Sequence, residues 1–295
     1  MKKAIVFAPL LLLLIGWNST DLLDKKIKPK TKKVILLDYT IERSPMLIEV
    51  ENTHANTNVP TANKMVMDTA VRKFYFLYDN YGQLYTVKSY SLEDDKETNP
   101  FRINMKVNNQ KQLSIINLEN KTDRLELIHK NDLLHQIAHY DPEFDELVIN
   151  TFTYGNNRLP KRTQLGNIDN PSELIDVSFT YDERQNVKQM IYPYGDTISY
   201  DYDLKNYTFG QQPYYYNPFY YLAVDWLIFT NYTPKNNIVK VEDNDSIVTI
   251  DYKYNENNMP ITAKVTRTNK ANTKDISVLN EYEFYYKEIV VSLRD

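Results

Sequence analysis

Three of the four histidines, His129, His135 and His139, lie close together, and histidine is a common metal ligand and proton carrier. His135 and His139 have the spacing of the two zinc ligands in a His-Glu-x-x-His helix, but Gln136 occupies the position of the general base. The segment also alternates apolar residues with histidines, which is typical of a strand. A strand would place His135 and His139 about 13 Å apart, too far to share a metal. We therefore predict no metal site here.

Acidic residues gather in three short segments, 93–95, 141–146 and 242–245. None has the Asp-x-Asp-x-Asp-Gly layout of a calcium loop, so we interpret them as solvated turns. The chain also lacks cysteine, Gly-x-Ser-x-Gly and a phosphate-binding loop. We therefore predict a protein that is not an enzyme and has no cofactor. A hydrolase with two carboxylates facing each other across a pocket is the less favoured alternative.

An aromatic cluster is the best candidate for a binding site, because exposed tyrosine and tryptophan rings stack on sugars and anchor protein interfaces. Its members are Tyr214, Tyr215, Tyr216, Tyr220 and Trp226. The three consecutive tyrosines precede a predicted helix in a proline-flanked loop, which favours their exposure. The alternative is that these rings cover the core between that helix and a sheet.

The elements that must position these residues follow from a recurring phrase of an aromatic residue, any residue, Tyr, and then Asp, Asn or Gly. It occurs at 76–79, 152–155, 179–182 and 252–255, each time before a polar turn. Between the turns, segments such as 103–107, 176–181 and 248–252 alternate apolar and polar residues, as strands do. With 25 tyrosines the composition also suits half-buried strands. We predict an all-β, antiparallel meander that forms a flattened or half-open barrel-like sheet.

One helix is expected, near 218–229. Asn217 can cap it and Pro218 suits its first position. The segment is apolar nearly all round, with Asp225 as its only charge, so we expect it to be buried against the sheet or to plug an open barrel end.

The N-terminal segment predicts export. Residues 1–18 have the basic start, the apolar run and the polar end of a signal peptide. Leu14-Ile15-Gly16 is followed by Trp17, which stands where a lipoprotein signal has its cysteine, so we expect a soluble exported form or one anchored by an uncleaved signal. Residues 19–33 form a basic tether, and 34–295 form a single domain whose best sub-boundary lies at 160–172.

Residues 179–203, with the pair Tyr181-Asp182 and with Gly195-Asp196 leading to Tyr200, resemble the YD repeat of Rhs-type bacterial shell proteins. Over 75–295 the chain is similar to the secreted YD-patterned proteins of unknown function common in Bacteroidota, usually described as candidate lipoproteins. The matching stretches are 217–219, 236–241, 252–260 and 282–286. The resemblance implies an all-β sheet, an envelope or extracellular location and no known enzymatic activity.

The net charge of −4 argues against a nucleic-acid partner. We therefore expect a non-catalytic exported cell-envelope protein, at most peripheral to the membrane, that binds a glycan or an envelope protein. The alternative is a structural β-scaffold that assembles with copies of itself, as YD-repeat shells do. That alternative requires exposed edge strands.

Overall fold

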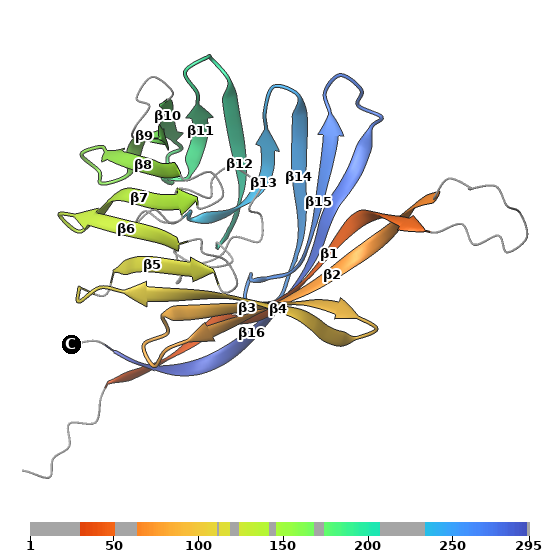
Figure 1. The fold of residues 1–295 in the computed structure, drawn as a ribbon, viewed down its shortest axis with the longest axis horizontal. Coiled ribbons are helices and arrows are strands. Elements are labelled where there is room, and N and C mark those ends of the chain that lie inside the picture. Colours follow the sequence, from red (N-terminus) through yellow and green to blue (C-terminus); the bar gives the residue numbers. More distant parts are fainter. Residues whose placement is uncertain are drawn as a thin grey trace, which may run out of the picture.

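The computed structural model describes residues 30–50, 64–110, 112–118, 124–141, 146–167, 174–206 and 234–293. These residues form sixteen antiparallel strands in one closed barrel (Figure 1). The first eight strands are β1 (Thr31–Val50), β2 (Lys64–Tyr78), β3 (Leu84–Glu93), β4 (Lys96–Val107), β5 (Leu113–Leu118), β6 (Arg124–Lys130), β7 (Leu133–Asp141) and β8 (Glu146–Tyr154). The last eight are β9 (Pro160–Asn167), β10 (Ile175–Tyr181), β11 (Val187–Ile191), β12 (Thr197–Asn206), β13 (Asn236–Glu242), β14 (Ser246–Tyr254), β15 (Pro260–Asn269) and β16 (Ile276–Ser292).

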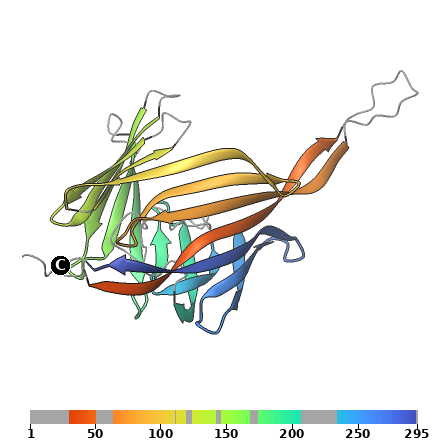
Figure 2. The same cartoon turned by 90° about the horizontal axis from the view of Figure 1, so that it is seen from below.

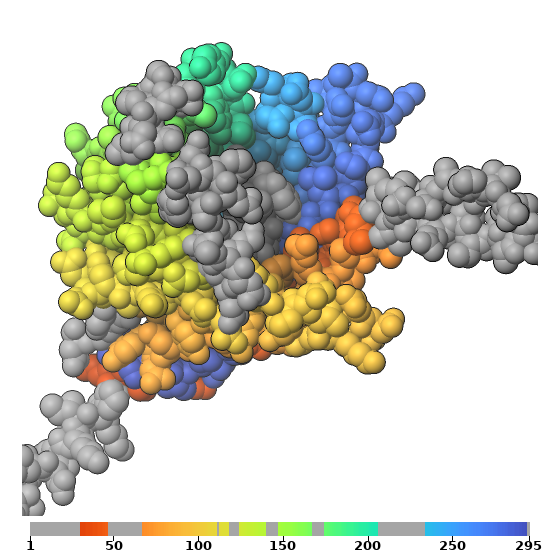
Figure 3. All heavy atoms as spheres, viewed as in Figure 1, coloured from red at the N-terminus to blue at the C-terminus, as the bar shows by residue number. Residues whose placement is uncertain are grey.

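Each strand pairs with the next along the chain, and the ring closes where β1 pairs with β16. That pairing runs from Thr31 opposite Ser292 to Arg43 opposite Glu281. The two strands lie side by side in Figure 2, and Figure 3 shows the surfaces of the first and last strands in contact. The all-β, antiparallel prediction is confirmed, and the expected flattened or half-open sheet is wrong. Closure gives the backbone groups of the first and last strands a partner that an open edge would lack.

The recurring phrase is a hairpin turn with a fixed hydrogen-bond pattern. In the turn between β10 and β11, the Asp182 carboxylate accepts the backbone N–H groups of Arg184 at 2.9 Å and Asn186 at 2.8 Å. Asp79, Asn108 and Asn255 accept the same two N–H groups, two and four residues on, in their own turns. A short polar side chain at this position therefore closes each turn, which explains the Asp or Asn of the phrase.

Tyrosines near the strand ends join neighbouring strands through their hydroxyls. Three phrase tyrosines, Tyr78, Tyr154 and Tyr181, donate to the preceding strand's backbone, whereas Tyr254 donates to the Asp203 carboxylate. The Tyr78 hydroxyl donates to the carbonyl oxygen of Leu37 on the preceding strand at 2.8 Å. The hydroxyls of Tyr154, Tyr181, Tyr202 and Tyr286 make the same kind of bond, each to a carbonyl of the preceding strand. All five rings pack against the apolar core. Tyrosine rather than phenylalanine suits these positions, because the ring fills the core while the hydroxyl satisfies a backbone acceptor.

The structure can be compared with the expected helix, the expected N-terminal segments and the expected sub-boundary. The helix expected near 218–229 and the signal peptide at 1–18 lie outside the described residues, and the described residues contain no helix. The first strand begins at Thr31, so the last residues of the expected tether at 19–33 belong to β1. The stretch Pro160–Asn167 is strand β9, which is paired with β8 and β10, so the sheet runs through the start of the expected sub-boundary at 160–172.

Within these described ranges, no helix is long and apolar enough to cross a bilayer.

Candidate ligand-binding site inside the barrel

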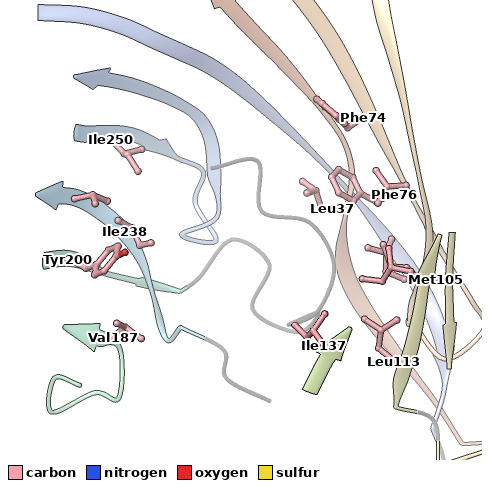
Figure 4. Packing of buried hydrophobic residues seen from close by; sticks show 14 of the residues in the cluster. Leu37, Phe74, Phe76, Met105, Leu113, Ile137, Val187, Tyr200, Ile238 and Ile250 are labelled. Atoms are coloured by element: carbon pink, nitrogen blue, oxygen red, sulfur yellow. The ribbon is translucent and has the colours of Figure 1, made fainter. Parts of the chain in front are cut away.

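The alternation of each strand sorts its side chains between the inside and the outside of the barrel. On β14, Ile250 is buried in the apolar core and Val248 packs against that core. Asp251, the next residue after Ile250, points to the opposite side of the strand and is exposed. The buried apolar side chains come from strands all around the ring. Figure 4 shows them on opposite walls, with Phe76 and Met105 on one side and Tyr200 and Ile250 on the other, all pointing inward. Most buried inward side chains are therefore apolar, and polar residues such as Glu42, Asn150 and Asn280 are exceptions.

The outer face carries charged residues that pair across neighbouring strands. Arg162 on β9 forms a two-armed ion pair with Asp176 on β10, and the hydrogen bond from Arg162 lowers the pKa of the aspartate. Lys264 on β15 lies 3.1 Å from Glu281 on β16. A barrel that spans a membrane presents an apolar band about 25 Å tall to the lipid. The outer face of this barrel carries these ion pairs beside exposed apolar side chains such as Ile175, Ile261 and Val290.

Glu242, at the end of β13, shows the same polar character. Its carboxylate lies 2.6 Å from the ammonium group of Lys240 and 2.8 Å from that of Lys270. The hydrogen bonds from Lys240 and Lys270 lower the pKa of Glu242 to about 2. The carboxylate therefore stays charged across the physiological pH range.

A cavity of about 510 Å³ opens on the inner face of β2, β3 and β4. This volume lies within the usual range of about 300–1,000 Å³ for small-molecule sites. Its apolar lining comes from Phe74, Val87, Phe101 and Ile103. Its polar lining includes Arg72, Ser89, Ser91 and Asn99. Apolar and polar side chains contribute about equally to the lining, so the cavity suits a ligand that has both an apolar and a polar part.

The strand register fixes the order of these residues. Arg72 lies opposite Ser91 on β3, Phe74 opposite Ser89, and Phe76 opposite Val87. Phe76 and Val87 are each 1% exposed, whereas Arg72 is exposed to solvent. The cavity thus has a polar rim at Arg72 and becomes apolar with depth.

Behind the rim lies a buried polar cluster on the inner faces of β1 and β16. The Glu42 carboxylate, which lies opposite Arg72 in the strand register, accepts hydrogen bonds from Ser44 at 3.1 Å and from the Asn280 amide. Burial raises the pKa of Glu42, while the hydrogen bonds from Ser44 and Asn280 and the charge of Arg72 oppose that rise. The hydrogen bonds of the cluster compensate the buried carboxylate, and the charge of Arg72 on the neighbouring strand also favours its ionised form.

On the outside, four tyrosines form a continuous row across β16, β1, β2 and β3. The Tyr39 ring stacks on Tyr285 with centroids 4.2 Å apart and lies 5.8 Å from Tyr75, which meets Tyr90 edge-on at 5.9 Å. The ammonium group of Lys73 lies 4.5 Å from the centroid of the Tyr39 ring and 4.6 Å from that of Tyr75. We call these four rings the outer tyrosine row. Lys73 covers part of its face, so the rings are less available than an open stacking platform.

The expected binding residues Tyr214, Tyr215, Tyr216, Tyr220 and Trp226 lie outside the described residues, so that hypothesis stays a prediction.

The histidines and two of the acidic segments are placed as expected. His135 and His139 lie on strand β7, which confirms the strand interpretation. Burial lowers the pKa of His129 on β6. In the turn at 242–245, the Asp243 carboxylate accepts the backbone N–H groups of Asp245 and Ser246, and the segment 93–95 also ends in a turn. Among the described residues, no group of three or more metal-binding side chains comes together.

Sequence reasoning missed the inner cavity, although the signal was present. Arg72, Phe74 and Phe76 are spaced two residues apart and therefore share one face of a strand. A charged residue in phase with two buried phenylalanines marks an inward position near a rim. The contiguous aromatic run at 214–226 is a stronger local signal, and it predicts a binding site elsewhere in the chain.

Comparisons with known proteins identify the fold. No family model matches the chain, and no curated protein matches its sequence. Among solved structures, a porin-like protein from Bacteroides uniformis is similar, with a TM-score of 0.57 and 10% identity over 85% of this chain and 96% of that chain. A porin-like protein from Bacteroides vulgatus aligns over 86% of this chain and 99% of that chain, with 8% identity and a TM-score of 0.29. The first likeness shows a porin-like barrel fold; at this identity it carries no activity over to this chain.

Proposed function

We propose that this protein is a non-catalytic, exported cell-envelope protein whose barrel binds an amphipathic small molecule in its apolar interior. The observation that carries the proposal is the direction of the side chains, apolar inside and charged outside. A porin wall has the reverse arrangement, with an apolar face toward lipid and a polar lumen. A barrel of sixteen strands is wide enough to enclose a lumen, and here the lining suits an apolar guest rather than a water channel.

Export is part of the proposal and has separate support. Residues 1–18 have the layout of a signal peptide, and the fold is similar to that of a porin-like protein. The charged outer face favours a barrel in the aqueous part of the envelope, peripheral to the membrane at most. Each lysine or arginine that faces lipid at the membrane midplane costs about 2–4 kcal/mol. Several cations on the outer face would each carry this cost if the barrel wall faced lipid.

The experiment is a detergent-free binding assay on the full-length chain exported by a bacterial host. The protein is incubated with a fluorescent single-chain amphiphile and passed over a gel-filtration column. We expect the amphiphile to co-elute with the folded barrel at about one per chain and to be displaced by unlabelled competitor. A barrel that elutes without amphiphile, or that stays in solution only with detergent, would contradict the proposal.

The outer tyrosine row favours a second candidate function, the binding of a glycan. Its rings are close enough to present a joined aromatic surface, and such surfaces stack on sugars. Replacing Tyr285 by alanine should then weaken retention on an immobilised polysaccharide, with replacement of the buried Tyr200 by phenylalanine as a control. Equal retention of the two variants would remove this candidate.

The structural alternative, a scaffold that assembles with its own copies, has less support. It requires exposed edge strands. The ring is closed, and β1 beyond Arg43 and β2 before Arg72 pair with each other but with no third strand among the described residues. A single monomeric species in light scattering would count further against it.

A further inference from the structure

We propose that the cavity on β2, β3 and β4 selects a single-chain amphiphile with a carboxylate head, a long-chain fatty acid, and holds its carboxylate at Arg72. This inference rests on the proposed function and names the ligand class of the same site.

The depth of the cavity favours a ligand with a long apolar chain. Successive inward residues of a strand are about 6.6 Å apart, so Phe74 lies about 6.6 Å along β2 from Arg72. From the rim inward the lining changes from Arg72 and Ser91 to Phe74 and Ser89 and then to Val87. A chain that enters head outward can contact Phe74, Val87, Phe101 and Ile103.

The rim favours an anionic head. Among the described residues that line the cavity, Arg72 is the only charged one, and it is exposed at the mouth. A guanidinium donates two parallel N–H groups to a carboxylate, a pairing that is shorter and stronger than a neutral hydrogen bond. The Ser91 hydroxyl lies opposite Arg72 and adds a third donor.

Glu42 shapes this site without lining it. Its carboxylate oxygens accept from Ser44 and Asn280, and it lies opposite Arg72 on the strand away from the cavity. Arginine has five N–H donors in a fork, so one side of the guanidinium can face Glu42 while the other faces the cavity. The two side chains interact through their charges, with Glu42 on the strand next to Arg72.

The volume limits the ligand to one chain. A cavity of about 510 Å³ equals the liquid volume of about seventeen water molecules, at about 30 Å³ each. That space suits a drug-sized molecule rather than a two-chain phospholipid.

The test compares head groups on one chain length, using the full-length protein and competition against a fluorescent fatty acid. Palmitate should compete at least about tenfold better than hexadecanol, because a hydrogen bond to a charged group is worth more than one to a neutral group. Hexadecyltrimethylammonium and the two-chain lipid phosphatidylglycerol should compete less well than palmitate. Equal competition by palmitate and hexadecanol in the unmodified protein would overturn the head-group assignment.

Variants assign the effect to Arg72. Arg72→Met should weaken palmitate about tenfold and leave hexadecanol unchanged, and Arg72→Lys should retain part of the preference. The matched control is Lys88→Met, which removes a cation from the outward face of β3 and should leave palmitate binding unchanged. An Arg72→Met variant that binds palmitate at full strength would overturn the proposal. If none of the amphiphiles binds, the proposed function itself fails, whereas binding without head-group preference leaves that function standing.

Discussion

Exchanging one methyl for a hydroxyl tests which face of the wall is apolar. Val87 is 1% exposed, and its neighbours across the sheet, Phe76 and Ile103, are apolar. Val87→Thr conserves shape and places a hydroxyl among these side chains. Burying a hydroxyl without a partner costs about 1–3 kcal/mol in proteins. At about 2–4 °C per kcal/mol for a chain of this size, the melting temperature should fall by about 2–12 °C.

The matched control is the reverse exchange on the outer face. Thr262 lies opposite Lys253 on β14 and Glu283 on β16, so its side chain points outward among charged residues. Thr262→Val should change the free energy of unfolding by less than about 0.5 kcal/mol. Both variants are followed by thermal unfolding under circular dichroism, without detergent. If Val87→Thr melts like the unmodified protein while Thr262→Val raises the melting temperature, the outer face is the apolar one and the reasoning is refuted.

Three further predictions concern the hairpin turns and surface charges. Asp182→Ala removes the acceptor of two backbone N–H groups and should lower the free energy of unfolding by about 2 kcal/mol. Asp182→Asn should lower it by less than about 1 kcal/mol, because Asn255 accepts the same two N–H groups in its own turn. Urea unfolding measures both changes. Gln185 has a φ of 69°, so Gln185→Gly should stabilise by about 0.5–1 kcal/mol in the same assay, and a loss of stability would contradict the turn geometry. The pKa of Glu242 is lowered from 4.5 to about 2, so its stabilising effect is present above pH 4.5 and is lost as the pH falls toward 2. Glu242→Gln should therefore flatten the dependence of stability on pH in this range. An unchanged pH dependence would argue against the ion pairs with Lys240 and Lys270.

The local structure could be predicted because its causes lie close together in the sequence. The segments 103–107, 176–181 and 248–252 are within strands β4, β10 and β14, as their alternation indicated. The tyrosine phrase predicted the turns, because Asp182 reaches only two and four residues along the chain. Interactions of such short range are encoded by adjacent residues.

Closure and the cavity could not be predicted in the same way. Closing the ring depends on pairing Thr31 with Ser292, which are at opposite ends of the chain, and no local pattern fixes such a partner. The cavity requires Arg72, Ser91 and Phe101 to converge from three strands, and convergence depends on register. The two-residue alternation of side chains along β2 could have shown that Arg72 points inward, on the same face as Phe74 and Phe76. It could not have shown that a space of ligand size lies in front of it.

The central claim is that a ligand occupies the inside of the barrel and that the outside faces water. The most direct test is photocrosslinking of the full-length protein with a fatty acid that carries a photoreactive group in its chain, followed by mass spectrometry of the peptides. The account predicts adducts on the inward residues Phe74, Val87 and Phe101 and none on their outward neighbours Tyr75 and Lys88. Adducts on the outward residues, with the inward ones unlabelled, would contradict it.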